Sequence, residues 1–182
     1  LNSLSQTLSN LTFAGNSGSI TGGTLRLNPS QAVAVTGTGH VISSLVALDS
    51  TATFNTASAA ALTVSNVISN GTNGAQSLTK SGLGALTLSA ANTYSGPTTV
   101  SEGLLRVNGS LAAASTVTVA SGGVLGGTGL IAGGVAGNGG LIAPGASPGI
   151  LTVQGNLAAS GSTAFAFEFL STGDPTWSNA AA

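Results

Sequence analysis

The feature that most constrains this chain is a short phrase that returns about every twenty residues. Within residues 78–108, the segments 84–88 (GALTL) and 103–107 (GLLRV) each place a glycine before two apolar residues that are two positions apart. Apolar residues at that spacing lie on one face of a strand. The glycine marks a turn that a side chain would obstruct. The segment therefore predicts strand, turn and strand in succession.

Related phrases extend this pattern over most of the chain. Residues 20–28 align with residues 100–108 at an offset of eighty, which is four periods of twenty, and residues 119–124 continue the series. Such periods are typical of solenoids, because one repeat cannot bury its apolar face alone. No helical period separates the strands, and a propeller blade needs about 40 residues, which argues against leucine-rich repeats and propellers. We predict an all-β parallel β-helix with about 20 residues per coil, and roughly nine coils over about 40 Å.

The same residues resemble a known family. The phrase is similar to the autotransporter-associated β-strand repeat, or passenger-associated transport repeat, found in passenger domains of bacterial type V secretion proteins. The matching residues are Leu78–Gly82, Gly84, Leu86–Leu88, Ala91–Gly96, Thr98–Val100, Gly103 and Leu105–Asn108. Residues 141–155 are similar to a segment that commonly follows this repeat, whereas Ala90, Pro97 and Glu102 depart from the pattern. The resemblance implies a right-handed β-helical stalk that is exported across two membranes, and it names no reaction.

Composition narrows the classes of partner. Charged residues make up 4% of the chain and the net charge is −1, against about 25% charged residues in ordinary soluble proteins. Arg26, Lys80 and Arg106 are the only cations, so no basic patch for nucleic acid or anionic lipid is expected. Cysteine is absent, which excludes disulfides and thiolate metal sites and fits a chain that is secreted unfolded.

The length of the chain and the sequence at its start indicate how many domains to expect. The 182 residues are enough for one domain with a continuous core, so we expect a single β-helical segment over 1–182, with 78–108 as its best-matching repeat. The chain starts in the middle of the pattern, with no basic region followed by an apolar one. We therefore expect a fragment of a longer passenger. Glycine, serine, threonine and proline interrupt every apolar stretch, which excludes a membrane helix.

Two motifs match catalytic or cofactor patterns and fail on mechanism. Residues 145–149 (GASPG) match the nucleophile elbow of serine hydrolases. The residue after the nucleophile must donate a backbone N–H to the oxyanion hole, and Pro148 has none. Residues 127–132 (GTGLIA) match a dinucleotide-binding loop, but that loop needs a following helix and a later acidic residue. Gly133 and Gly134 would break the helix.

The few titratable residues also favour a structural chain. His40 is the sole histidine, and we expect it on a surface turn, with Asp49 as the only acid in the neighbouring coils. Glycoside hydrolysis needs two carboxylates that flank the bond. Asp49 and Glu102 are far apart in the sequence, and only Glu168 and Asp174 could meet across a bend. We therefore expect no enzyme activity, no cofactor, and no catalytic, cofactor-binding or metal-binding residue.

Three further features carry expectations about packing. Tyr94 is expected to make an apolar contact at a coil corner, with a ligand groove as the alternative. Asn92 could lie in a turn ladder and bond to the backbone. Residues 163–169 predict the clearest strand, with Phe165, Phe167 and Phe169 on one face and Glu168 outward. Together with the other large apolar residues near the C-terminus, this strand predicts that fragment 110–182 is sturdier than fragment 1–76.

These observations favour a structural stalk of a bacterial surface or secreted protein. The resemblance implies export through the periplasm and the outer membrane, and a translocation barrel that lies outside this chain as the partner. We expect a monomeric stalk that holds a distal region away from the membrane and supports translocation. The alternative is an adhesin segment that binds a host or glycan surface. A carbohydrate-active β-helix enzyme is the more distant alternative.

Overall fold

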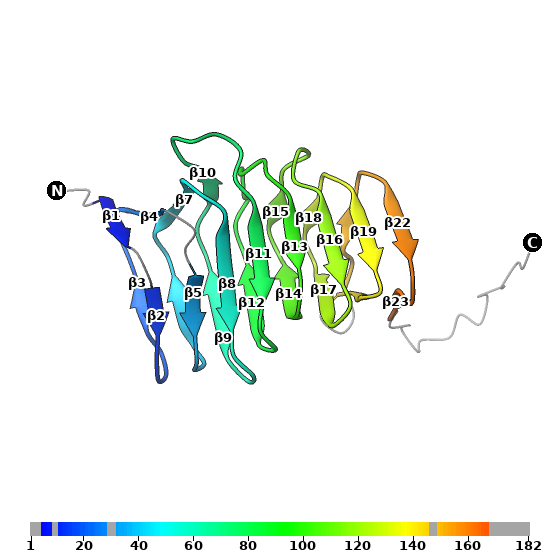
Figure 1. The fold of residues 1–182 in the computed structure, drawn as a ribbon, viewed down its shortest axis with the longest axis horizontal. Coiled ribbons are helices and arrows are strands. Elements are labelled where there is room, and N and C mark those ends of the chain that lie inside the picture. The colour runs from blue at the N-terminus through cyan, green and yellow to red at the C-terminus, as the bar shows by residue number, and fades with distance from the viewer. Residues whose placement is uncertain (1–4, 9–10, 29–31, 146–148, 168–182) are drawn as a thin grey trace, which may run out of the picture.

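Short parallel strands make up the fold. The computed structural model describes residues 5–8, 11–28, 32–145 and 149–167. Figure 1 shows the strands stacked side by side along one long axis, with β1 near one end of the stack and β22 and β23 at the other. None of the described residues is helical, so that part of the chain contains no helix able to cross a membrane. The predicted all-β solenoid is confirmed, and its right-handed winding stays a prediction.

Three sheets run the length of the stack. Sheet I consists, in spatial order, of β2 (Leu11–Phe13), β5 (Ala32–Val35), β8 (Ala52–Thr56), β11 (Leu78–Ser81), β13 (Thr98–Val100), β16 (Val117–Ala120), β19 (Val135–Asn138) and β22 (Leu157–Ser160). Sheet II consists, in the same direction, of β3 (Ser19–Ile20), β6 (His40–Ile42), β9 (Ala61–Val64), β12 (Ala85–Leu88), β14 (Gly103–Val107), β17 (Gly123–Gly127), β20 (Leu141–Pro144) and β23 (Ala164–Phe165).

Sheet III is divided into two parts. The first part consists of β1 (Ser5–Leu8), β4 (Thr24–Leu27), β7 (Leu45–Leu48) and β10 (Ile68–Asn70), and the second of β15 (Ser110–Leu111), β18 (Leu130–Ile131) and β21 (Thr152–Val153). The coil between the two parts has no named strand on this side. Only a parallel bridge between Ala91 and Ser110 continues the sheet there.

The strand register shows how many residues each coil contains. Along sheet I, successive register partners lead from Leu11 in the first coil to Ala159 in the last. One turn averages roughly 21 residues, at the short end of the repeat lengths that are typical of solenoids. The longest step in sheet I, from Phe54 to Lys80, contains the loop at 71–77.

The described residues do not form the expected nine coils. The described residues make about seven turns, or about 34 Å at the usual strand spacing. Four of the seven steps along sheet I are longer than twenty residues, and residues 168–182 lie outside the described part of the chain.

Alternation along each strand builds one continuous core. Leu86 and Leu88 of β12, and Leu105 and Val107 of β14, are fully buried, while the residues between them face outward. Each such side chain gains about 1.5–3 kcal/mol from leaving water. The buried apolar residues form a single cluster that runs from Phe13 to Ile142. The period-two pattern of the sequence therefore predicts the core correctly.

The glycines of the repeat stand where two coils approach closely. A Cβ on Gly84 would lie 2.3 Å from the Ala57 carbonyl oxygen. Gly103 has a φ of +66°, and a Cβ there would lie 2.3 Å from the Gly82 carbonyl oxygen. Both contacts are too short for any side chain, and a positive φ further favours glycine. The predicted role of these glycines is confirmed.

One repeat alignment is wrong. Residues 20–28 were aligned with 100–108, yet Thr24–Leu27 form β4 in sheet III and Gly103–Val107 form β14 in sheet II. The register instead connects Ile20 to Val107 through sheet II. Most of the coils between them are longer than the assumed period, so a fixed offset of eighty moves the match onto another side of the solenoid.

The expected C-terminal strand is also different. Of residues 163–167, only Ala164 and Phe165 are in a strand, and Phe169 and Glu168 lie outside the described residues. Phe165 is 39% exposed and Phe167 is 60% exposed. Their rings stack on each other, with centroids 6.0 Å apart, instead of entering the core. The burial from which a sturdier C-terminal fragment was expected is therefore not found at these residues.

Candidate functional site

The structure gives no catalytic or cofactor-binding arrangement to the described residues of the two rejected motifs, 127–132 and 145–149. Residues 127–132 run from the end of β17 through a turn into β18, so a strand stands where a dinucleotide-binding loop needs a helix. Residues 146–148 of the elbow-like segment lie outside the described residues. In the part of the chain that the structure covers, no three His, Asp or Glu side chains are placed to hold a metal ion.

Asp49 belongs to an ion pair that joins three coils. Its Oδ1 accepts hydrogen bonds from Arg26 Nη2 at 2.5 Å, from the Thr72 backbone N–H at 2.7 Å and from the Thr72 hydroxyl at 2.9 Å. Burial alone would raise the pKa of this carboxyl. The hydrogen bonds from Thr72 and the charge and hydrogen bond of Arg26 outweigh burial and hold the pKa below its ordinary value. Asp49 is thus a structural carboxylate that cross-links coils.

The other acids do not form a catalytic pair in the described residues. Glu102 lies on the turn before β14, at the outside of the coil. Glu168 and Asp174, which could have met across a bend, lie outside the described residues. The arrangement that a glycosidase needs, with two carboxylates flanking one bond, is therefore not seen in the part that the structure describes.

His40 contradicts the expected surface position. The residue is 1% exposed, and its ring packs on Phe13 with centroids 5.1 Å apart. Its Nδ1 accepts a hydrogen bond from the Gly18 N–H at 2.9 Å, and its Nε2 lies 3.0 Å from the Gly15 carbonyl oxygen. His40 starts β6 on the same face as Ile42, so the strand carries the ring inward.

Asn92 occupies the gap in sheet III. Its Oδ1 accepts the Ile68 N–H at 2.9 Å, and its Nδ2 donates to the carbonyl oxygens of Ala90 at 2.9 Å and Ser110 at 3.1 Å. One buried side chain thus joins β10 on one side to β15 on the other. The predicted bonding of Asn92 to the backbone is confirmed. It acts as a single bridge between the two parts of the sheet.

Tyr94 fills the corner beside Asn92. Its ring is fully buried, as expected for a corner contact, but its hydroxyl also lies 2.6 Å from the Thr98 Oγ1, which lies 3.0 Å from the Ser115 Oγ. Burial raises the pKa of Tyr94 to about 12, and the hydrogen bonds with Thr98 and Ser115 only partly oppose that effect. The corner is therefore an internal hydroxyl chain and offers no ligand groove.

Lys80 is the buried cation of the core. Its Nζ donates to the carbonyl oxygens of Ser81 at 2.8 Å, Gly82 at 2.5 Å and Glu102 at 3.0 Å, so it ties the turn after β11 to the turn of the next coil. Burial lowers the pKa of Lys80 to about 8, and the charge of Glu102 offsets only part of that effect. The three donors of an ammonium group match the three carbonyls.

The outer face of sheet I carries a column of hydroxyls. Thr53, Thr79, Thr99 and Thr118 are partners in register on four neighbouring strands, each half-buried. Within the described residues no hydrogen bond engages these four hydroxyls. They therefore form a straight, uncharged row that can bond to a partner outside the molecule. We call this row the threonine column.

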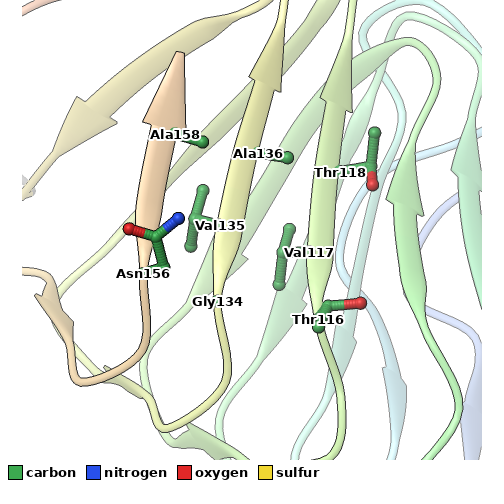
Figure 2. Close-up of a pocket in the computed structure, with 8 residues that line it drawn as sticks. All are labelled: Thr116, Val117, Thr118, Gly134, Val135, Ala136, Asn156 and Ala158. Atoms are coloured by element: carbon green, nitrogen blue, oxygen red, sulfur yellow. The ribbon is translucent and has the colours of Figure 1, made fainter.

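The threonine column ends at a shallow hollow. The next residues in register after Thr118 are Ala136 and Ala158, whose short side chains leave a space of about 260 Å³ on the surface. Figure 2 shows its lining, which comes from β16, β19, β22 and the residues just before them: Thr116, Val117, Thr118, Gly134, Val135, Ala136, Asn156 and Ala158. The hollow is uncharged and mostly apolar, and it is the candidate binding site of this chain.

Sequence reasoning missed the buried polar residues although a signal was present. Lys80 is two positions after Leu78, and His40 is two positions before Ile42. Alternation alone places each polar residue on the core face. A histidine after a glycine-rich turn indicated the surface instead, and no internal role was expected for Lys80. The hollow had no signal in the sequence, because the match of Thr118 with Ala136 and Ala158 depends on two coils of unequal length.

Comparisons with known proteins support the passenger interpretation. Residues 78–107 match the sequence profile of the passenger-associated transport repeat. A relative named Adhesin BmaC autotransporter, from Brucella suis biovar 1 (strain 1330), is 39% identical over 98 residues, or 52% of this chain. The chain spans only 3% of the length of that relative. No solved structure gave a significant match.

The matched repeat lies in the middle of the stack. Residues 78–107 hold β11 to β14, the buried Lys80 and the corner of Asn92 and Tyr94. The chain is thus a β-solenoid that carries a passenger-associated transport repeat and is related over about half its length to an autotransporter adhesin.

Proposed function

We propose that this chain is one β-helical segment of the passenger of an autotransporter-like protein, and that it serves as a structural stalk. The observation that carries the proposal is the position of the passenger-associated transport repeat, residues 78–107, inside a parallel stack whose sheets I and II are continuous. Each coil contacts mainly its neighbours, so stability adds up along the axis. Such a stack is stiff and can hold a distal region away from a membrane.

The remaining parts of the proposal concern place and partner. The stalk is exported through the periplasm and the outer membrane and stands at the cell surface or is released from it. Its partner during export is an outer-membrane translocation barrel outside this chain, and the stalk is a monomer. Folding of the coils outside the cell supports outward movement of the chain. The passenger repeat and the autotransporter relative support export and the barrel partner.

We further propose that the segment is not an enzyme and needs no cofactor or metal. Two of the charged groups that a reaction could use have structural partners: Asp49 is paired with Arg26, and Lys80 is held by three carbonyls. The carboxyl and the ammonium are both buried. Neither group can reach a substrate without opening the core.

A display experiment tests the stalk. The chain is fused between a signal peptide and a translocation barrel with an N-terminal epitope, and surface epitope is counted by antibody on intact cells. We expect strong display of the wild-type chain and a severalfold loss for Leu105→Asp, which places a charge in the core. The matched control is Arg106→Asp, an exposed residue of the same strand. Equal display of Leu105→Asp would contradict a role for folding in export.

Adhesion is a second candidate because the threonine column and the hollow form an uncharged surface with open hydroxyls. The name of the relative, an adhesin, points the same way. We expect the labelled chain to bind a host-cell or glycan surface through this face. Ala136→Lys would fill the hollow and abolish binding, while Thr63→Lys, on the outer face of sheet II, would leave binding unchanged. Equal binding by both variants would remove this candidate.

A further inference from the structure

Four asparagines of this chain are each followed directly by a glycine: Asn70, Asn73, Asn108 and Asn138. Such a pair can modify itself, because the backbone nitrogen of the glycine can attack the side-chain amide carbon of the asparagine. A glycine has no Cβ to hinder that approach. The attack also requires the glycine N–H to leave any hydrogen bond that it makes. The structure therefore determines which of the four pairs can react.

Three of the four pairs are held by a neighbouring coil, because the glycine N–H donates a backbone hydrogen bond to it. These bonds are Gly71 N–H to Leu48 O at 2.7 Å, Gly109 N–H to Leu88 O at 3.1 Å and Gly139 N–H to Ser160 O at 3.2 Å. All three glycines are half-buried. Each nitrogen would have to leave a hydrogen bond between coils before it could react.

Asn73 and Gly74 lie instead on the loop at 71–77, which arches from β10 to β11 (Figure 1). Both residues are exposed. Within the described residues, the Gly74 N–H makes no hydrogen bond to another coil, and the Gly74 backbone only bridges Gly71 in the same turn. A Cβ on Gly74 would meet no atom within 4 Å. Of the four pairs, this one alone has a glycine nitrogen that no other coil holds.

The reaction of such a pair forms a cyclic imide and releases ammonia. The Gly74 nitrogen gives its proton to base and bonds to Asn73 Cγ, while the Cγ–Nδ2 bond breaks and Nδ2 takes up a proton and leaves as ammonia. Water then opens the imide at either carbonyl. The product at position 73 is an aspartyl residue when the new bond breaks, and an isoaspartyl residue when the main-chain bond breaks. Water is the only co-reactant, and nothing is oxidised or reduced.

The amide that is lost is the one that anchors the loop. Asn73 Nδ2 donates to the Asp49 carbonyl oxygen at 2.7 Å. A carboxylate cannot donate a hydrogen bond, so two acceptors would face each other after the reaction. The new negative charge would also stand next to Thr72, whose N–H and hydroxyl bind the Asp49 carboxylate. Because like charges repel, the modified loop loses its hold on the coil of Asp49.

We propose that Asn73 and Gly74 form a self-modifying site, at which loss of ammonia releases the loop at 71–77 from the solenoid. The change is spontaneous and one-way, because the ammonia diffuses away. The stack itself stays closed, since the other three pairs are protected by the hydrogen bonds that join their coils. An ageing chain thus acquires a negative charge and an open loop at one defined place.

Peptide mapping by mass spectrometry on the full chain tests the site. The folded chain is kept at mildly alkaline pH, and conversion of each of the four asparagines is followed by its mass gain and by fragmentation that distinguishes aspartyl from isoaspartyl. We expect Asn73 to convert about tenfold faster than the other three, the factor that corresponds to opening one backbone hydrogen bond. In urea, where no pair is protected, all four should convert at similar rates. A folded chain in which Asn73 is not the fastest, or a lead of Asn73 that persists in urea, would overturn the site.

Two variants test the release of the loop. Asn73→Gln keeps an amide donor but would have to close a larger ring, so conversion at position 73 should cease to be measurable on the same timescale. Asn73→Asp carries the charge of the product, and limited proteolysis should cut it within 71–77 several-fold faster than freshly prepared wild type. The matched control is Asn108→Asp, which changes an exposed asparagine of another coil and should leave cleavage within 71–77 unchanged. Equal cleavage of Asn73→Asp and fresh wild type would overturn the release of the loop.

Discussion

The region at 78–107 and the coil at 149–167 both contain large apolar residues, but their burial differs. In the first, Leu78, Leu86 and Leu105 are completely buried. In the second, Ile150 is 78% exposed and Leu157 is 48% exposed. Both regions have parallel strands in sheets I and II. They differ clearly in what lies beside them.

The difference shows that burial of a side chain in a solenoid depends on the neighbouring coils. A middle coil is covered by a described coil on each side, and its inward side chains pack against both. In the described residues, β22 and β23 have a paired strand on one side only. Large apolar side chains alone do not create a core, so a count of phenylalanines along the sequence gives a false estimate of local stability.

The largest expected effect is the loss of stability when a charge is placed in the core of the middle region, compared with the same change in the last described coil. Leu105→Asp puts an unpaired carboxylate in the core and should lower the free energy of unfolding by about 3–5 kcal/mol. Phe167→Asp changes a side chain that is 60% exposed and should cost no more than about 0.5 kcal/mol. Urea unfolding followed by circular dichroism measures both. Similar losses for the two variants would break the contrast between the coils.

A smaller effect is expected from the bridge in sheet III. Asn92→Ala leaves the Ile68 N–H and the carbonyls of Ala90 and Ser110 without their side-chain partner, at a cost of about 2–4 kcal/mol. Asn156→Ala, in the last described coil, changes an exposed residue and should be nearly neutral. Hydrogen exchange at Ile68 gives the local readout. Unchanged protection of Ile68 in Asn92→Ala would show that the backbone closes the gap without the side chain.

A third effect is a pH dependence of stability that arises in the middle coils. The pKa of Lys80 is about 8 in the folded chain against an ordinary value of 10.5, so between these values the unfolded chain holds the proton and the folded chain does not. Stability should therefore rise with pH in this range, by at most about 1.4 kcal/mol per pH unit. Tyr94 acts in the opposite direction from pH 10 upward, because its pKa is raised to about 12.

Urea unfolding from pH ~7 to ~11 measures this profile. We expect the free energy of unfolding to be highest near pH ~10. Lys80→Met should remove its rise below that pH and so shift the maximum. Tyr94→Phe should remove its fall above that pH and so broaden the maximum. Residues 149–167 contain no titratable side chain, so exchange in that coil should not follow the profile. A rise that persists in Lys80→Met would assign it to another group.

The sequence predicts the architecture well because the two signals that indicate it, alternation of apolar residues and the positions of glycines, are local. Alternation in residues such as Leu86 and Leu88 determines which face is buried, and glycines such as Gly84 mark the close approaches. Coil number and repeat equivalence are less accessible, since they depend on loop lengths that differ from coil to coil. The step from Phe54 to Lys80, for example, is much longer than the step from Thr118 to Ala136. A fixed period therefore placed Thr24–Leu27 on the wrong side of the solenoid.

The candidate site is less predictable because it depends on neighbouring coils. The positions of Lys80 and His40 follow from alternation, but their partners are backbone atoms of other coils, such as the Glu102 carbonyl and the Gly18 N–H. Backbone groups are present at every position, so the sequence contains no sign of which ones meet. The hollow arises in the same way, from the register that brings Ala136 beside Thr118.

Cross-linking between neighbouring strands tests the parallel register of the solenoid most directly. The chain has no cysteine, so pairs of new cysteines report on it cleanly. Thr79 and Thr99 are partners on adjacent strands, about 4.8 Å apart, which is within the range that a disulfide spans. Thr79 and Thr118 are two strands apart, or about 9.6 Å, which is too far. Mild oxidation of the folded chain should therefore cross-link Thr79→Cys/Thr99→Cys and leave Thr79→Cys/Thr118→Cys reduced. Cross-linking of the second pair and not the first would contradict the solenoid.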